Sequence, residues 1–114
     1  MVEIFQDRRK SPRLYSRIPI QYKDVKQYYT VFKGTLAKNI GENGLRVISN
    51  EFIPISTNLI LDIFLHSIGQ IRAICRVVWI EKIRYIEQYD IGMEFIEITD
   101  ENRGYITDYI ENLY

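Results

Sequence analysis

Arginine is the residue type whose spacing first suggests a chemical role for this chain. Residues 7–13 read Asp-Arg-Arg-Lys-Ser-Pro-Arg, in a chain whose formal net charge is zero. Guanidinium groups present planar forks of N–H donors that match phosphate oxygens and the acceptor edge of guanine. Arg9 and Arg13, with Arg8 beside them, therefore predict an anion-binding segment, although an isolated basic cluster is more often a solvated charge run.

A second pattern is a short stretch of small residues. Residues 39–44 read Asn-Ile-Gly-Glu-Asn-Gly, which gives the spacing Asn39-x-Gly41-x-x-Gly44. Asn43-Gly44 predicts a tight turn with positive φ angles. The short side chain and the glycines allow backbone N–H groups to approach a ligand closely. The same stretch is also what an ordinary hairpin turn looks like, so neither pattern identifies a site by itself.

Patterns typical of enzymes and metal sites are absent from the sequence. It contains no G-x-S-x-G, no H-E-x-x-H and no phosphate loop ending in Gly-Lys-Ser/Thr. His66 and Cys75 are the single histidine and the single cysteine, so they form neither a disulfide nor a metal cluster. We therefore predict a protein without catalytic residues, metal or cofactor, in which Cys75 is a small core residue.

The elements that must position the two patterns are short strands. Alternating apolar residues and turn signals predict about six strands, with no helix between them, which favours a small antiparallel barrel or sandwich. In the strand predicted over 70–80, one face carries these alternate residues: Ile71, Ala73, Cys75, Val77 and Trp79.

The C-terminal residues predict one amphipathic helix. Thr99 is a favourable N-cap, and Asp100 and Glu101 follow it where the helix dipole favours acids. Apolar residues then recur at helical spacing. These residues are Tyr105, Ile106, Tyr109, Ile110 and Leu113. The stripe predicts a helix that packs against one end of the sheet or barrel.

Composition indicates one domain of an ordinary soluble kind. The chain has 114 residues, of which 46% are hydrophobic and 26% are charged. No apolar run approaches the ~20 residues that cross a bilayer, and the N-terminus lacks the regions of a secretory signal, so we expect a cytoplasmic location. We expect a flexible arm over 1–17, a β-barrel over 18–98 and the helix over 99–114.

Charge is unevenly distributed along the chain. Residues 1–26 carry seven cations and three acids, whereas residues 81–114 carry three cations and nine acids. A domain that binds duplex nucleic acid is expected to be basic over a whole face. The distribution therefore favours a small anionic ligand over duplex nucleic acid.

Taken together, the order and spacing of these motifs resemble the PilZ family. The family has Arg-x-x-x-Arg followed by Asp/Asn-x-Ser-x-x-Gly at a strand end, similar to residues 9–13 and 39–44 here. Residues 76–79, Arg-Val-Val-Trp, and residues 90–95, Asp-Ile-Gly-Met-Glu-Phe, are similar to further segments of the family. The amphipathic C-terminal helix also matches, so the resemblance covers the chain from Arg8 onward.

The resemblance implies an all-β fold with a C-terminal helix, namely a six-stranded antiparallel barrel that binds cyclic di-GMP without catalysis. In the family the arginine motif lies in a loop that folds over the barrel on binding. Carried over, Arg9 and Arg13 hold the phosphates and a guanine. Arg8 adds a guanidinium that in related domains accompanies binding of a stacked, paired form of the ligand.

The resemblance also implies roles for the turn. Asn39 is expected to hydrogen-bond a guanine edge, Gly44 to shape the turn, and Trp79 to lie near a base, with a core position as the alternative for Trp79. The chain departs from the family at Gly41, where the family has serine. A neutral hydrogen bond contributes about 0.5–1.5 kcal/mol and 1.4 kcal/mol is tenfold in affinity, so we expect about tenfold weaker binding.

Two alternative functions stay open at this stage. Gly41 in place of serine is consistent with a protein-interaction module of the same fold that has lost nucleotide binding. Tyr28, Tyr29, Phe32 and Lys33 are consistent with a barrel that binds single-stranded nucleic acid, because such sites interleave aromatic residues with cations. If the chain is a cyclic di-GMP receptor, as the resemblance implies, ligand binding is expected to order the 1–17 arm and so to change the surface shown to a downstream partner protein.

Overall fold

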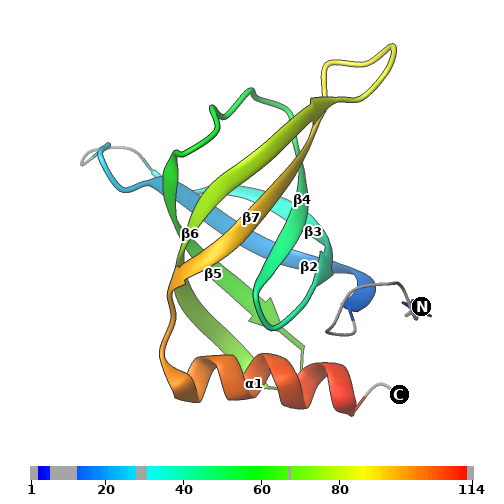
Figure 1. The fold of residues 1–114 in the computed structure, drawn as a ribbon, viewed down its shortest axis with the longest axis vertical. Coiled ribbons are helices and arrows are strands. Elements are labelled where there is room, and N and C mark those ends of the chain that lie inside the picture. The colour runs from blue at the N-terminus through cyan, green and yellow to red at the C-terminus, as the bar shows by residue number, and fades with distance from the viewer. Residues whose placement is uncertain (1–2, 6–12, 28–30, 67, 113–114) are drawn as a thin grey trace.

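The computed structural model describes residues 3–5, 13–27, 31–66 and 68–112, with side chains from residue 17 onward. The described residues form seven strands and one helix (Figure 1). These are β1 (Glu3–Phe5), β2 (Arg13–Asp24), β3 (Lys33–Ile40), β4 (Gly44–Ser49), β5 (Asn58–Leu65), β6 (Gly69–Lys82), β7 (Tyr89–Glu97) and α1 (Asp100–Glu111).

Strands β2 to β7 close into an antiparallel barrel. Their order is β2-β3-β4-β7-β6-β5, and β2 also pairs with β5, which joins the two ends of the sheet. The short strand β1 pairs with the beginning of β2, where Ile4 lies opposite Leu14. Each of the described barrel strands is therefore paired on both sides, and closure removes the sheet edge. The predicted six-stranded barrel is confirmed.

The barrel interior is filled by the apolar residues that alternate along the strands, since successive side chains point to opposite faces. The largest fully buried strand side chains are Ile18, Ile20, Ile40, Leu45, Val47, Leu61, Ile63, Leu65, Val77 and Ile91. Cys75 has no exposed surface, and burial raises the pKa of its thiol above the ordinary value. Its predicted role as a core residue is confirmed.

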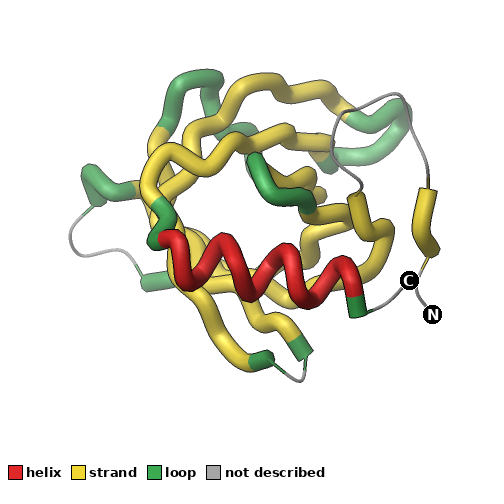
Figure 2. Tube along the Cα trace, turned by 60° about the horizontal axis from the view of Figure 1, so that its bottom comes forward, coloured by secondary structure: helices red, strands yellow, loops and turns green. Residues whose placement is uncertain are grey.

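Helix α1 lies across one end of the barrel, as Figure 2 shows. Thr99 caps it, because its hydroxyl oxygen accepts a hydrogen bond from the Asn102 N–H at 3.0 Å. Ile106, Tyr109 and Ile110 are buried beneath the helix. The predicted N-cap and apolar stripe are confirmed, apart from position 113, which is not described. No helix in the described part of the chain is long and apolar enough to span a membrane.

The first barrel strand begins earlier than expected. The arm was predicted to extend to residue 17, whereas β2 begins at Arg13. The second arginine of the Arg-x-x-x-Arg motif therefore belongs to a barrel strand, at least in its backbone. The predicted flexibility of the arm concerns residues that lie largely outside the described ranges.

Trp79 faces outward, which corrects the face predicted from alternation. The pairing of β6 with β7 shifts register between Val77 and Trp79, so an extra residue, Val78, is inserted at this point. Such a bulge reverses the face on which the following side chains lie. Val77 has no exposed surface and Trp79 is 40% exposed. The alternative of a core aromatic at Trp79 is therefore wrong.

Candidate ligand-binding face

The turn between β3 and β4 needs glycine for space rather than for its φ angle. The Gly41 N–H donates to the Gly44 carbonyl at 2.8 Å. The predicted positive φ at Asn43-Gly44 is wrong, because Gly69 is the one described glycine in that region and Asn43 lies outside it. A Cβ on Gly44 would lie 2.1 Å from the Met93 carbonyl oxygen. The close approach of β4 to β7 therefore depends on glycine at position 44.

Two further hydrogen bonds fix this turn against its neighbours. The Phe95 N–H of β7 donates to the Asn43 carbonyl at 3.0 Å. From α1, Arg103 Nη1 donates to the Glu42 carbonyl at 2.7 Å. The turn is thus held from both β7 and the helix, which makes it a firm edge for a binding surface.

A row of four residues crosses the outer wall of the barrel above this turn. The strand register pairs Asn39 of β3 with Arg46 of β4. It also pairs Arg46 with Gly92 of β7, and Gly92 with Trp79 of β6. Directly paired residues share a face, and three strand spacings amount to ~14 Å. We call these four residues the transverse row.

Trp79 rests against the backbone of β7 at one end of the transverse row. A Cβ on Gly92 would lie 2.1 Å from the Trp79 indole nitrogen, so the indole occupies the space that any other residue at position 92 would fill. The remaining surface of the indole contributes to the 40% exposure of Trp79. This arrangement presents an aromatic surface to solvent on the outside of the barrel.

Arg46 and Asp90 form a bidentate ion pair in the middle of the same wall. Arg46 Nε donates to Asp90 Oδ1 at 2.6 Å, and Nη2 donates to Oδ2. The Arg46 side chain is 32% exposed and that of Asp90 13%. Sequence analysis selected neither residue. They are far apart in the chain, and only the register of β4 on β7 makes them neighbours.

The other predicted site residues are distributed as follows. Arg8 and Arg9 lie outside the described residues. Arg13 begins β2, and two positions later Tyr15 is paired with Asn39. Asn39 has no exposed surface, so its amide is not accessible to a ligand in this conformation. The structure thus brings Asn39, the turn and Trp79 to one wall, with the backbone of Arg13 beside it.

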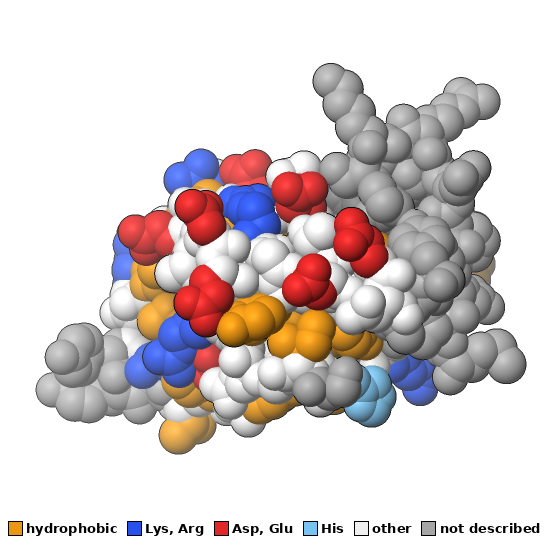
Figure 3. Space-filling model, turned by 90° about the horizontal axis from the view of Figure 1, so that it is seen from below, with side chains coloured by type: hydrophobic (Ala, Val, Ile, Leu, Met, Phe, Trp, Pro, Cys, Tyr) orange, Lys and Arg blue, Asp and Glu red, His pale blue; other side chains and the backbone are white. Residues whose placement is uncertain are grey.

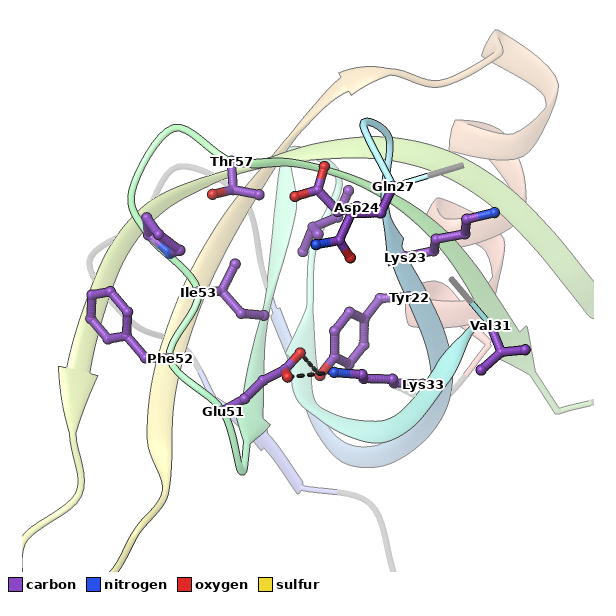
Figure 4. A pocket seen from close by; sticks show the side chains of 12 residues that line it. Tyr22, Lys23, Asp24, Gln27, Val31, Lys33, Glu51, Phe52, Ile53 and Thr57 are labelled. Carbon is purple, nitrogen blue, oxygen red and sulfur yellow. Dashed lines mark hydrogen bonds and ion pairs between the residues drawn. The ribbon is translucent and has the colours of Figure 1, made fainter. Parts of the chain in front are cut away.

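A polar cavity of about 190 Å³ lies elsewhere, between the end of β2 and the loop before β5 (Figure 4). Within it, Tyr22 donates to Glu51 at 2.9 Å and Lys33 Nζ donates to Glu51 at 2.5 Å. The Lys33 hydrogen bond lowers the pKa of Glu51, and burial raises the pKa of Tyr22. None of the predicted site residues whose side chains are described lines this cavity, which we interpret as a structural polar cluster.

Comparison with family models decides what kind of barrel this is. The model described as "PilZ domain" matches residues 7–112. The chain belongs to the PilZ family. PilZ domains are receptors for cyclic di-GMP and are generally not enzymes. The resemblance inferred from the sequence is confirmed.

Solved structures with the same fold include several PilZ proteins. The inhibitor of motility MotI/DgrA of Bacillus subtilis is 21% identical, with a TM-score of 0.76 over 95% of this chain and 52% of that one. The PilZ domain of YcgR from Escherichia coli, solved with c-di-GMP, is 10% identical, with a TM-score of 0.70 over 94% and 92%. The MrkH–c-di-GMP complex of K. pneumonia is 17% identical, with a TM-score of 0.74 over 95% and 52%.

This PilZ chain therefore spans about half the length of the MotI/DgrA and MrkH chains. A search of curated proteins found no sequence match. At these identities the likeness shows the fold, and the ligand of this particular domain is a matter for proposal.

Proposed function

We propose that this PilZ domain is a non-catalytic receptor for cyclic di-GMP, which it binds on the wall crossed by the transverse row. The observation that carries the proposal is the row itself, because it brings Asn39 and the exposed Trp79 to one face, ~14 Å apart by strand spacing. An amide and an aromatic surface are what a guanine edge and a guanine face require. The YcgR and MrkH structures support the proposal because both contain this ligand.

In this proposal the arginine motif supplies the positive charge that binds the phosphates of the ligand. Arg9 and Arg13 bind the phosphates and a guanine, and Arg8 adds a further guanidinium. Charge-assisted hydrogen bonds to the ligand offset the entropy of ordering the segment that precedes β2. Because Asn39 is buried in the present conformation, binding also rearranges the chain around it. The rearranged arm then presents a new surface to a downstream partner protein in the cytoplasm.

Isothermal calorimetry with cyclic di-GMP at modest salt tests the proposal. We expect saturable binding with a dissociation constant in the micromolar range or below. Trp79 is the single tryptophan of the chain, so its fluorescence provides a second readout during the same titration. GMP serves as the control ligand, since it lacks the second guanine. Folded protein that shows neither heat nor a fluorescence change at high micromolar concentration would exclude the receptor function.

Gly41→Ser is expected to strengthen cyclic di-GMP binding about tenfold, because it restores the hydroxyl that the family has at this position. Gly41 does not adopt a positive φ, so its backbone conformation is one that serine also adopts. Gly34→Ser is the matched control: Gly34 lies in β3, and a Cβ there would make only an ordinary contact, with the Ile20 carbonyl oxygen at 4.0 Å. Unchanged affinity in a folded Gly41→Ser variant would show that the missing hydroxyl does not limit binding.

A second candidate function is a PilZ-fold interaction module that no longer binds nucleotide. Gly41 at the family's serine position favours it. It predicts no binding by the wild-type protein in the calorimetry experiment. The titration of the wild type therefore separates the two functions.

Binding of nucleic acid is disfavoured by the surface of α1. Figure 3 shows acidic side chains gathered over this helix. The exposed acids of α1 are Asp100, Glu101, Asp108 and Glu111. Lys33 donates to Glu51 in the polar cavity, whereas the Phe32 ring is contacted by Lys23 and Arg72, so Lys33 and Phe32 do not act together as the predicted aromatic and cationic pair.

A further inference from the structure

We propose that Arg103 of α1 is a positioning residue for cyclic di-GMP binding. Its guanidinium holds the turn between β3 and β4 in the conformation that receives the ligand, and the bound ligand stabilises the beginning of α1 through the same contact. The inference rests on the proposed function. It assigns a residue that neither of the family's two motifs contains, and it gives the C-terminal helix a part in the response to the ligand.

The turn needs an external restraint because of its composition. Residues 41–43 connect β3 to β4, and Gly41 and Gly44 lie at the two ends of this connection. Glycine loses more backbone freedom on ordering than any other residue. Gly41 also lacks the hydroxyl of the family's serine, so at this position the turn offers a ligand only backbone groups. Backbone N–H groups bind a ligand only in a suitable turn conformation, so affinity depends on how often the turn adopts it.

Arg103 supplies such a restraint from outside the barrel. Two backbone hydrogen bonds hold the turn, one within it and one from β7. The bond from the helix joins Arg103 Nη1 to the carbonyl of Glu42, in the middle of the turn, at 2.7 Å. Its donor is charged, which makes it stronger than a bond between neutral groups. It is formed by a side chain, so a substitution removes it without altering the backbone of the turn.

The backbone that carries Arg103 is itself fixed. The Arg103 N–H donates to the Thr99 carbonyl at 2.9 Å, in the capped first turn of α1. Ile106 and Ile110, further along the helix, are buried against the barrel. In the described part of the chain Arg103 forms no ion pair, although its helix is rich in acids. A partly buried guanidinium on a rigid support therefore serves the turn, as a positioning residue requires.

The contact couples the ligand to the helix in both directions. If the ligand favours the turn conformation in which Glu42 accepts from Arg103, then ligand binding strengthens this hydrogen bond and stabilises the first turn of α1. Coupling free energies are reciprocal, so loss of the hydrogen bond must weaken ligand binding by the same factor. Both effects can be measured separately.

Calorimetry with cyclic di-GMP compares Arg103→Ala with Asn102→Ala. Asn102 is the matched control, because its Nδ2 also donates from α1 to a barrel carbonyl, that of Arg72 at 3.2 Å, on β6 rather than in the turn. Each variant loses one hydrogen bond between helix and barrel, so each should lower the Tm by a few degrees. Arg103→Ala alone is expected to bind the ligand more weakly, by about three- to tenfold, because its turn adopts the receptive conformation less often. Arg103→Lys, which keeps a charged donor, is expected to restore most of the affinity.

Hydrogen exchange followed by mass spectrometry distinguishes positioning from attraction by charge. Without ligand, the segment 39–45 is expected to exchange faster in Arg103→Ala than in the wild type, and at the wild-type rate in Asn102→Ala. At saturating cyclic di-GMP, exchange in the segment 100–106 should slow in the wild type but not in Arg103→Ala. Weaker binding by Arg103→Ala with unchanged exchange in the ligand-free turn would mean that the charge merely attracts the anionic ligand, and would overturn the positioning role.

The outcomes separate this inference from the proposed function. A wild-type protein that does not bind cyclic di-GMP overturns both. If the wild type binds, Arg9→Ala does not, and Arg103→Ala binds as tightly as Asn102→Ala, then the receptor function stands and the role of Arg103 is wrong.

Discussion

Replacing Arg9 or Arg13 by alanine is expected to remove most cyclic di-GMP binding. Hydrogen bonds to charged groups contribute about 1.5–3 kcal/mol each, and a guanidinium bound to a phosphate commonly forms two of them. Each substitution should therefore weaken binding about a hundredfold or more, at 1.4 kcal/mol per tenfold. Calorimetry at one fixed salt concentration gives the affinities, and the loss should be visible as an absence of heat at concentrations that saturate the wild type.

Lys10→Ala is the control that the segment itself provides. It removes one positive charge from between the two motif arginines, so it reproduces the change in net charge without removing a guanidinium. We expect its affinity to fall by no more than a few fold. Equal losses in Lys10→Ala and Arg13→Ala would mean that the segment attracts the ligand by charge alone, and wild-type binding by Arg13→Ala would remove the motif from the site.

The barrel and its helix were predictable because the signals that specify them are local. Alternation in a strand such as 89–97 places Ile91 and Met93 inside the barrel without knowledge of its partners. Likewise Thr99 caps α1 through the N–H of Asn102, three positions along the chain. Features of this kind depend on a few neighbouring residues, so a single sequence contains them.

The outer wall was only partly predictable, because it depends on strand register. Trp79 was assigned to the inner face because simple alternation was continued past Val77. The only local sign of the bulge is Val78, an apolar residue at a position that alternation assigns to the outer face. Arg46 and Asp90 were overlooked because they meet only when β4 pairs with β7. Pairings between distant segments are set by the whole barrel, and one sequence without its fold does not reveal them.

For the arginine motif, sequence and structure establish the position of the residues but not their contacts with a ligand. Its spacing and the family match identify Arg9 and Arg13 as candidates, and the structure adds that the backbone of Arg13 begins β2 near the partner of Asn39. The contacts of these side chains with a ligand remain predictions, which the alanine variants above are designed to measure.

Glycine at two positions is required for the packing of the outer wall that the transverse row crosses. Gly44 lets β4 approach the backbone of β7, and Gly92 leaves space on β7 for the Trp79 indole. Both positions are buried, and neither has a positive φ. In both cases the missing Cβ is needed for contact between neighbouring groups. The sequence predicted glycine at position 44 from the φ preferences of turns. The structure instead requires it because a side chain there would not fit against β7.

Gly44→Ala is therefore expected to destabilise the domain strongly. The new Cβ would lie 2.1 Å from the Met93 carbonyl oxygen and 3.1 Å from the Glu94 Cα, both backbone atoms of a paired strand. Main chain cannot rotate away as a side chain can, so β4 and β7 must separate. Overpacking of this kind typically costs about 1–3 kcal/mol, which corresponds to a fall in Tm of about 5–15 °C for a domain of this size. Thermal unfolding followed by circular dichroism measures the change.

Gly104→Ala provides a control with the opposite expected sign. Gly104 lies inside α1, and apart from the neighbouring backbone of the helix no described atom lies within 4 Å of its potential Cβ, so alanine introduces no clash. Alanine in a helix interior is favoured over glycine by about 0.5–1 kcal/mol, so the Tm should rise by a few degrees. The same chemical change then destabilises one site and stabilises the other. If Gly44→Ala were as stable as Gly104→Ala, the close approach of β4 to β7 would not be what requires glycine in the turn.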